Sequence, residues 1–222
     1  MHMKIAVLGT GKKAEAWKAK NLNANSYAWV QDTKSHADFD VFVDLDFDEN
    51  FTNLLSYSTN AKTVFLVSAV NISLEGAFAE NKIKSAGNKI IGINALPTMV
   101  ERTTLEYTNP YNIEIPTDLF ETLGYTTSTK VDSRVGLVTP RIICMIINEA
   151  FYTVQEGTAV AKDIDTAMKL GTNYPKGPFE FLELMGIKNV YNALNAVYND
   201  THDERYKVCA LLKKEFLVKG LG

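Results

Sequence analysis

The chain has 222 residues, of which 46% are hydrophobic and 22% charged, and its formal net charge is −3. This composition is typical of a globular protein and excludes collagen-like, low-complexity and wholly disordered classes. The length predicts one large domain or two modest ones. A mildly acidic chain lacks the basic surface of a nucleic-acid binder, and no apolar run reaches the roughly 18 residues of a membrane helix. We therefore expect neither nucleic acid nor membrane as a partner.

The cysteines and histidines indicate the compartment and exclude a metal site. Cys144 and Cys209 both lie in apolar helical patterns, so we expect buried free thiols, which suit a reducing cytoplasm. The N-terminal residues MHMKIAVLG show no basic region followed by a long apolar one, so we expect no secretion signal. The three histidines, His2, His36 and His202, lack the spacing of metal ligands. The prediction is a cytoplasmic protein without a bound metal.

The first half of the chain alternates short β-type runs with helical stretches, which predicts a mainly parallel, Rossmann-like sheet with right-handed crossovers. A less regular stretch follows, in which residues 103–107 could extend the sheet, 117–123 form a short helix and 125–131 are β-rich. The expected strands before it are residues 4–8, 26–30, 40–44, 62–67 and 89–93, and the expected helices are residues 14–21, 47–57 and 73–85.

The second half has a helical character. Thr139 is the expected N-cap and Pro140 the expected first residue of an amphipathic helix that reaches Val154. Gly171 is the expected C-cap of the next helix. The further expected helices are residues 163–170, 177–186, one around 190–197, and 206–216. The prediction is an α/β domain over residues 1–132 and an all-helical domain over residues 133–222.

A glycine motif follows the first predicted strand. Gly9, Gly11 and Ala14 match the pattern G-x-G-x-x-G/A between a strand and a helix. The glycines would permit a tight turn and close approach to a pyrophosphate, which the N-terminus of the helix would then bind. Asp32 lies 23 residues after Gly9, near the spacing at which an acid binds a ribose hydroxyl. These four residues predict a site for NAD, because Asp32 would repel the 2′-phosphate of NADP.

A strand–turn–helix corner that binds nothing is the alternative interpretation of this motif. Lys12 and Lys13 are bulky for such a loop, although their charge could also help to hold a phosphate. The third expected strand begins at Asp40, almost directly after Asp32. The first domain is therefore shortened relative to a full dinucleotide fold.

Several motifs of the second half resemble one protein family. The motif DIDTAMKLG and the motif PKGPFE are specific in combination, and further matches lie around them. Together they resemble the C-terminal domain of 3-hydroxyacyl-CoA dehydrogenases over essentially all of residues 135–219. The matching segments are residues 135–141, 147–150, 156–157, 163–171, 175–180 and 203–206. The resemblance implies NAD-dependent oxidation of 3-hydroxyacyl-CoA to 3-ketoacyl-CoA in fatty acid metabolism, an acyl-CoA-type ligand, and a homodimer formed through the helical domain.

The resemblance also implies the site residues. The family's catalytic histidine falls on Asn94, its glutamate on Glu106 and its serine on Ser73, whereas its asparagine falls on Pro140. An amide cannot accept and return a proton near pH 7, and proline offers no donor. Without a histidine partner, Glu106 is equally an ordinary strand-end acid. Ser73, at a strand-to-helix turn, is more often a helix N-cap than a catalytic group.

Three functions remain open from the sequence. The first is a working oxidoreductase with an altered site, and the second is a binding or scaffold protein that kept the fold without the chemistry. The third is an NAD-binding sensor without turnover. We predict a 3-hydroxyacyl-CoA dehydrogenase-like oxidoreductase that is weak or inactive, a pseudoenzyme, because Asn94 replaces the histidine. The alternative is a non-catalytic dimer that binds NAD or acyl-CoA.

Overall fold

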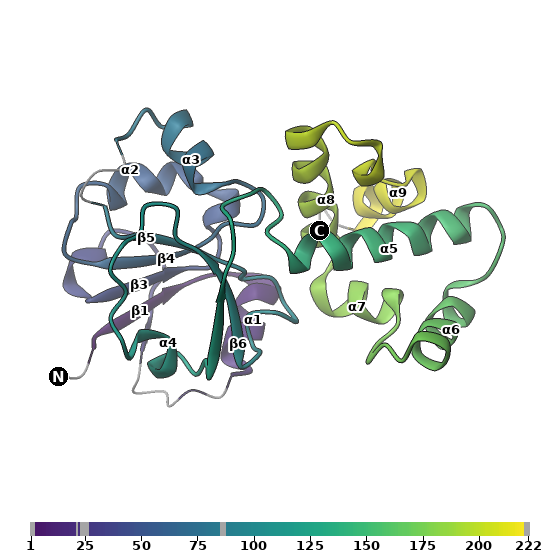
Figure 1. Ribbon diagram of the computed structural model, residues 1–222, viewed down its shortest axis with the longest axis horizontal. Coiled ribbons are helices and arrows are strands. Elements are labelled where there is room, and N and C mark those ends of the chain that lie inside the picture. The colour runs from purple at the N-terminus through teal and green to yellow at the C-terminus, as the bar shows by residue number, and fades with distance from the viewer. Residues whose placement is uncertain (1–2, 21, 23–26, 85–87, 220–222) are drawn as a thin grey trace. The chain divides into compact units, whose positions relative to one another are not determined.

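The computed structural model describes residues 3–20, 22, 27–84 and 88–219 (Figure 1). The chain divides into two compact units, Met1–Leu137 and Val138–Gly222. The division falls five residues beyond the boundary expected from the sequence. The segment between the two positions packs on the first unit, since the Gly136 N–H donates to the Val70 carbonyl at 2.6 Å and Leu137 is buried.

The first unit contains a seven-stranded sheet among the described residues, with the strand order β2-β1-β3-β4-β5-β6-β7. Neighbouring strands from β2 through β5 pair in parallel, β6 is antiparallel to β5, and β7 is parallel to β6. This confirms the Rossmann-like, mainly parallel sheet. The strands are β1 (Ile5–Leu8), β2 (Ala28–Trp29), β3 (Val41–Asp44), β4 (Val64–Ser68), β5 (Ile90–Ile93), β6 (Thr104–Thr108) and β7 (Thr127–Lys130).

The central strands are buried on both faces, which explains why they are continuous apolar runs rather than alternating ones. Val41 and Val43 of β3 belong to one apolar cluster, whereas Phe42 between them belongs to the cluster on the other face. Helices α1 and α4 contribute to the first cluster, and α2 and α3 cover the second (Figure 1). These helices are α1 (Gly11–Lys18), α2 (Leu54–Tyr57), α3 (Leu74–Glu80) and α4 (Leu119–Thr122).

Some elements are shorter than expected. The second strand is reduced to Ala28–Trp29, and the predicted helix over residues 47–57 consists of 3₁₀ turns at Phe47–Glu49 and Phe51–Asn53 followed by α2. Residues 21, 26 and 85, at the ends of other predicted elements, lie outside the described residues. Between Asp32 and β3, the chain forms a 3₁₀ turn rather than a further strand. β2 is therefore the outer strand on this side of the described sheet.

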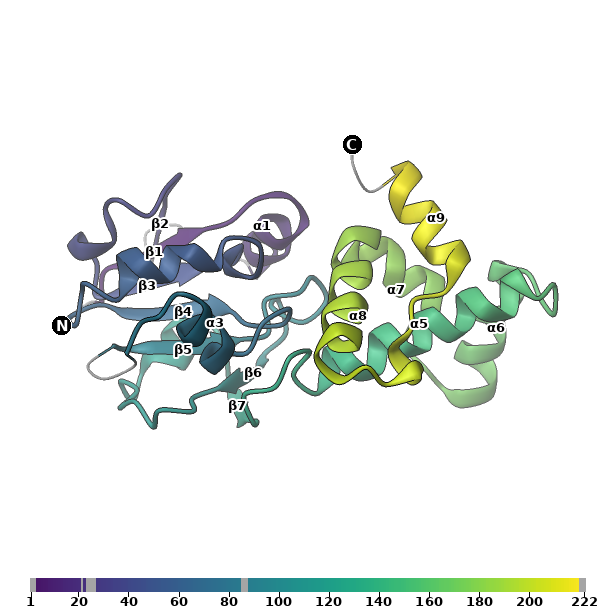
Figure 2. The same cartoon turned by 90° about the horizontal axis from the view of Figure 1, so that it is seen from above.

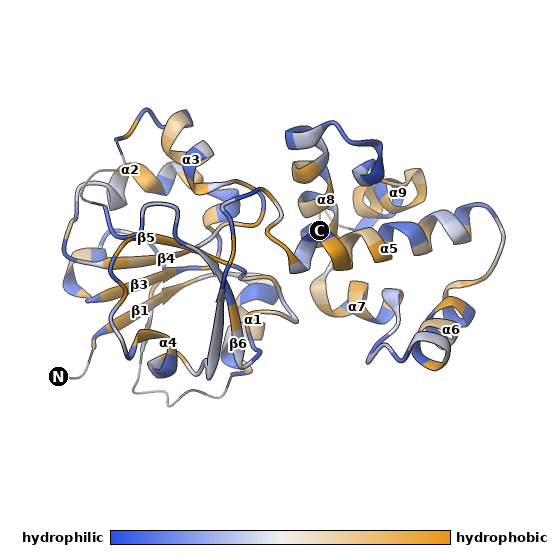
Figure 3. Cartoon of the chain, viewed as in Figure 1, coloured by the Kyte–Doolittle hydropathy of each residue, from blue (hydrophilic) through white to orange (hydrophobic). Residues whose placement is uncertain are grey.

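The second unit is helical, as expected. Helix α5 packs against α7 and α8 (Figure 2), and Ile147 and Phe151 of α5 are buried in its core. The apolar residues lie along this helix and along the strands of the first unit (Figure 3). The helices are α5 (Thr139–Gln155), α6 (Ala161–Thr172), α7 (Pro178–Met185), α8 (Ile187–Thr201) and α9 (Ala210–Lys219).

Three predicted helix ends were wrong. Val138 is the N-cap of α5, so Thr139 is the first helical residue and Pro140 the second. Helix α6 continues past Gly171 to Thr172, and its C-cap is Asn173, which adopts the left-handed conformation with φ of +57°. Asparagine tolerates this conformation, so the glycine is not needed there. Tyr206 lies in a separate 3₁₀ turn before α9, because the residues between the turn and the helix are not helical.

Cys144 and Cys209 are buried free thiols, as predicted. Burial raises the pKa of the Cys144 thiol to about 12, so this side chain is protonated and unreactive at neutral pH. Within the described ranges, no helix is long and apolar enough to span a membrane. The same residues hold no group of three or more His, Cys, Asp or Glu side chains placed to bind a metal ion.

Candidate active site

The strand order creates a topological switch point, where successive strands are added on opposite sides of β1, at the carboxyl edge of the sheet. The chain leaves β1 toward β2 on one side, whereas β3 lies on the other side of β1. In open sheets of this kind, ligands bind at such a point, beyond the carboxyl ends of the strands. Residues 9–14 follow β1, and residues 45–49 follow β3. The predicted glycine motif therefore lies at the position where the topology places a ligand.

Gly9 and Gly11 both lie at positions where a side chain would clash or be strained. A Cβ atom on Gly9 would lie 2.8 Å from Cδ1 of Leu45, so Gly9 lets the ends of β1 and β3 approach closely. Gly11 opens α1 with φ of +53°, a conformation that favours glycine. Ala14 is a buried residue of α1. The turn is formed as predicted, and its role in cofactor binding stays a prediction.

Lys13 is not placed to bind a phosphate. Its side chain is 3% exposed, and Nζ lies 3.7 Å from Asp48 Oδ2 and 4.0 Å from Glu49 Oε1. Asp48 also accepts hydrogen bonds from the Ser68 hydroxyl and from the Asn71 N–H. Lys13 therefore ties α1 to the segment after β3. The acidic partners of Lys13 come from a distant part of the sequence, so this lysine does not support the possibility that the charge of the turn helps to hold a phosphate.

Asp32 lies beyond the end of β2, and its side chain is 56% exposed. One carboxylate oxygen accepts the N–H of Lys34 at 2.9 Å, and Lys34 Nζ lies 3.9 Å from the other. The carboxylate thus remains accessible to a ribose hydroxyl, and this role stays a prediction.

One residue beside the glycine turn escaped the sequence analysis. Asp46, two residues after β3, accepts a hydrogen bond from the hydroxyl of Thr10 at 2.7 Å through its Oδ2. Thr10 is the N-cap of α1, so a carboxylate lies at the start of the helix that would receive a pyrophosphate. The glycine turn, Ala14 and Asp32 fit a dinucleotide, and Asp46 is a charge that opposes its phosphates. The sequence signal that could have identified Asp46 is the cluster of acidic residues directly after β3.

Asn94 and Glu106 lie together, as the resemblance implied. The Asn94 N–H donates to the Glu106 carbonyl at 3.0 Å, because Asn94 directly follows β5 and Glu106 belongs to the antiparallel neighbour β6. Asn94 Nδ2 donates to Glu106 Oε2 at 3.1 Å, and Asn94 Oδ1 accepts the Leu96 N–H at 3.3 Å. The Asn94 side chain is buried, and both ends of its amide are hydrogen-bonded within the protein.

Ser73 caps helix α3, which follows β4. Its Oγ accepts the Gly76 N–H at 3.0 Å, so the N-cap interpretation is confirmed. A further role in holding substrate stays a prediction. Pro140 is buried in the first turn of α5, in the second unit.

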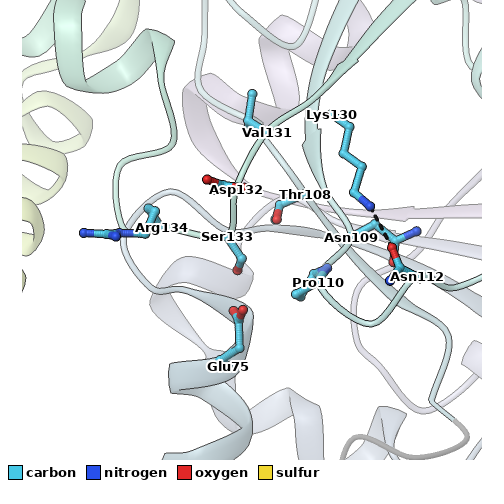
Figure 4. Close-up of a pocket in the computed structure, with 10 residues that line it drawn as sticks. All are labelled: Glu75, Thr108, Asn109, Pro110, Asn112, Lys130, Val131, Asp132, Ser133 and Arg134. Carbon is cyan, nitrogen blue, oxygen red and sulfur yellow. Dashed lines mark hydrogen bonds between the residues drawn. The ribbon is translucent and has the colours of Figure 1, made fainter.

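A polar pocket of about 430 Å³ lies between the start of α3, the loop after β6 and the segment after β7 (Figure 4). Glu75 and Ser133 point toward one another across it, whereas the guanidinium of Arg134 points away. Lys130 Nζ is held by the side-chain oxygen of Asn112 at 2.9 Å. None of the predicted site residues lines this pocket.

Part of the chain matches a known family, and several known proteins are similar to it. The family described as "3-hydroxyacyl-CoA dehydrogenase, C-terminal domain" matches residues 136–222. The 3-hydroxyadipyl-CoA dehydrogenase of Escherichia coli (strain K12) is 39% identical over 85 residues, which cover 38% of this chain and 18% of that protein. The 3-hydroxybutyryl-CoA dehydrogenase of Clostridioides difficile is 27% identical over 223 residues, which cover 96% of this chain and 77% of that protein.

The fold is also that of solved structures. The (S)-3-hydroxybutyryl-CoA dehydrogenase PaaH1 from Ralstonia eutropha superposes with a TM-score of 0.72 at 19% identity, covering 98% of this chain and 94% of that one. Its similarity therefore extends over both units. Residues 136–222 thus match the C-terminal domain of 3-hydroxyacyl-CoA dehydrogenases, and the chain as a whole is similar to 3-hydroxybutyryl-CoA dehydrogenases in sequence and in fold.

Proposed function

We propose that the protein is a 3-hydroxyacyl-CoA dehydrogenase-like oxidoreductase that binds NAD at the glycine turn and turns over 3-hydroxyacyl-CoA weakly or not at all. The observation that carries this proposal is the Asn94 amide, which donates to Glu106 and accepts from the Leu96 N–H. An amide in these bonds does not titrate near neutral pH. The position that the family resemblance assigns to the base therefore holds a group without base chemistry.

The chemical consequence follows from the reaction. Oxidising a 3-hydroxyl group requires removal of the hydroxyl proton while a hydride leaves the same carbon. NAD, when bound, supplies the hydride acceptor. Glu106 lies beside Asn94 but has no histidine to orient. Loss of a positioned general base lowers the rate by about 10²–10⁴-fold.

The test measures NADH formation from NAD and 3-hydroxybutyryl-CoA and, in the reverse direction, NADH consumption with acetoacetyl-CoA. We expect turnover far below the ordinary range of about 1–10³ s⁻¹. Ordinary turnover, with a pH profile that shows a base near neutrality, would mean that another residue is the base.

The same amide also favours a second candidate, a non-catalytic dimer that binds NAD or acyl-CoA. A site without a titrating base can bind both ligands without consuming them. The NADH assay distinguishes the two candidates, and calorimetric titration with NAD, and separately with CoA, measures whether each ligand binds. Saturable binding without any NADH formation indicates the binding role.

Replacing Asp32 with alanine is expected to weaken NAD binding by about tenfold or more. Hydrogen bonds to a charged group contribute about 1.5–3 kcal/mol, and Asp32 already shares its carboxylate with Lys34. The measurement is the dissociation constant by calorimetry. Asp38→Ala is the control, because Asp38 is an exposed acid in the 3₁₀ turn before β3. Absence of saturable binding to the wild type would reject the NAD site.

We also propose a homodimer formed through the helical unit. A groove of about 530 Å³ on this unit supports it, because its lining includes Ile142, Met145 and Ile146, and Ile142 is 52% exposed. Burying such apolar side chains favours association. Light scattering at micromolar concentration is expected to give a dimer, and Ile142→Glu to shift it toward monomer. Leu170→Glu on α6, where Leu170 is 84% exposed, is the matched control. A monomeric wild type would contradict the proposal.

A further inference from the structure

The start of helix α1 has the features of an anion-binding position. Its N-cap, Thr10, makes no side-chain hydrogen bond to the helix, and its first turn contains no acidic residue. The first N–H groups of a helix lack partners within it, and its dipole favours a negative charge there. Instead of capping α1, the Thr10 hydroxyl donates to Oδ2 of Asp46 at 2.7 Å. The protein therefore brings its own carboxylate to this position.

The backbone after β3 holds Asp46 in place. Its N–H donates to Oδ1 of the buried Asp44 at 2.9 Å, and its carbonyl accepts from Asn50 Nδ2 at 3.5 Å. Closure of β3 against β1 at Gly9 and Leu45 sets the distance between the two segments. The contact between Thr10 and Asp46 thus follows from the packing of two neighbouring strand ends, and a ligand at the glycine turn meets it.

The buried ammonium group of Lys13 does not neutralise the Asp46 carboxylate. Lys13 Nζ lies within 4.0 Å of both Asp48 and Glu49, so its charge is already balanced by other carboxylates. A pyrophosphate bound at α1 would add negative charge beside the Asp46 carboxylate. Like charges at short range repel, most strongly where water is partly excluded.

We infer that Asp46 is a specificity-determining residue of the glycine turn: its carboxylate competes with ligand phosphates for the start of α1. The inference rests on the proposed NAD site. It means that the turn discriminates against phosphate-bearing ligands relative to uncharged nucleosides. NAD affinity is then limited by this carboxylate as well as by the shortened first domain.

The experiment compares NAD with adenosine, which lacks phosphate, by calorimetry on the full chain. Asp46→Asn keeps an acceptor for the Thr10 hydroxyl and removes the charge. We expect it to bind NAD about tenfold more tightly than the wild type at low salt, with adenosine affinity unchanged. The gain should shrink as salt is added, because counterions screen charges that are exposed to solvent. Asp46→Ala, which also removes the charge, should give a gain of the same direction.

Asp38→Asn is the matched control, since it makes the same charge change in the 3₁₀ turn that precedes β3, at the other end of that strand. An equal gain in this control would overturn the inference, and so would an equal gain for adenosine. Measurable but equal NAD affinities of the wild type and Asp46→Asn would overturn it while leaving the NAD site intact. Absence of NAD binding to every variant would reject both.

Discussion

Replacing Asn94 with histidine is expected to raise the rate of 3-hydroxyacyl-CoA oxidation by about 10²-fold over the wild type. Asn94 is buried and hydrogen-bonded to Glu106 through Nδ2 at 3.1 Å, so an imidazole at this position would have a carboxylate within reach. A carboxylate partner orients the ring and favours its protonated form, which suits a base that takes up a proton from the substrate. The gain is limited to the lower part of the range for general bases, because Pro140 still offers no hydrogen-bonding side chain.

The readout separates base chemistry from a repaired fold. The rate of NADH formation in Asn94→His should show a pH profile with a base near neutrality, which the wild type lacks. Asn94→Gln is the control, since it changes the side chain but adds no base, and it should stay at the wild-type rate. Glu106→Gln in the histidine variant should lose much of the gain, because groups that act as a unit are not additive. Equal rates for the histidine and glutamine variants would show that Asn94 is not at the base position.

Replacing Lys13 with methionine is expected to destabilise the first unit by about 3 kcal/mol. Lys13 and Asp48 are both buried, and removing one member of a buried ion pair leaves the other charge uncompensated. The effect lies at the lower end for such pairs, because Asp48 keeps its hydrogen bonds to Ser68 and to the Asn71 N–H. Methionine fills most of the volume of the lysine stem, so the cost is mainly electrostatic.

Urea unfolding followed by tryptophan fluorescence measures this change in the right unit, since the two tryptophans of the chain, Trp17 and Trp29, both lie in the first one. Lys12→Met is the matched control: Lys12 is the exposed neighbour, and its replacement should stay within about 0.5 kcal/mol. The double variant Lys13→Met with Asp48→Asn should recover part of the lost stability, because no charge is then left buried alone. If Lys12→Met and Lys13→Met cost the same, the Lys13–Asp48 pair contributes nothing specific.

The sequence predicted the local features of the candidate site but not its long-range contacts. The glycine turn was predictable because Gly9, Gly11 and Ala14 are neighbours in the chain, and a turn between a strand and a helix is a local structure. The pairing of Asn94 with Glu106 came from the family resemblance, and the antiparallel contact of β5 with β6 is the physical cause of it. The role of Ser73 as an N-cap is local, which made it predictable.

By itself, the sequence determined the class of fold, because it depends on periodic apolar patterns and on Gly and Pro signals that act within a few residues. The buried runs of β1, β3, β4 and β5 and the apolar face of α5 are of this kind. Only the tertiary structure decided which charged groups lie beside the glycine turn. Lys13 pairs with Asp48, and Thr10 donates to Asp46, because β3 packs beside β1. The members of these two pairs are separated by 35 and 36 positions in the sequence. Such contacts depend on which strands become neighbours and on the exit direction of each chain segment, and no local pattern records either.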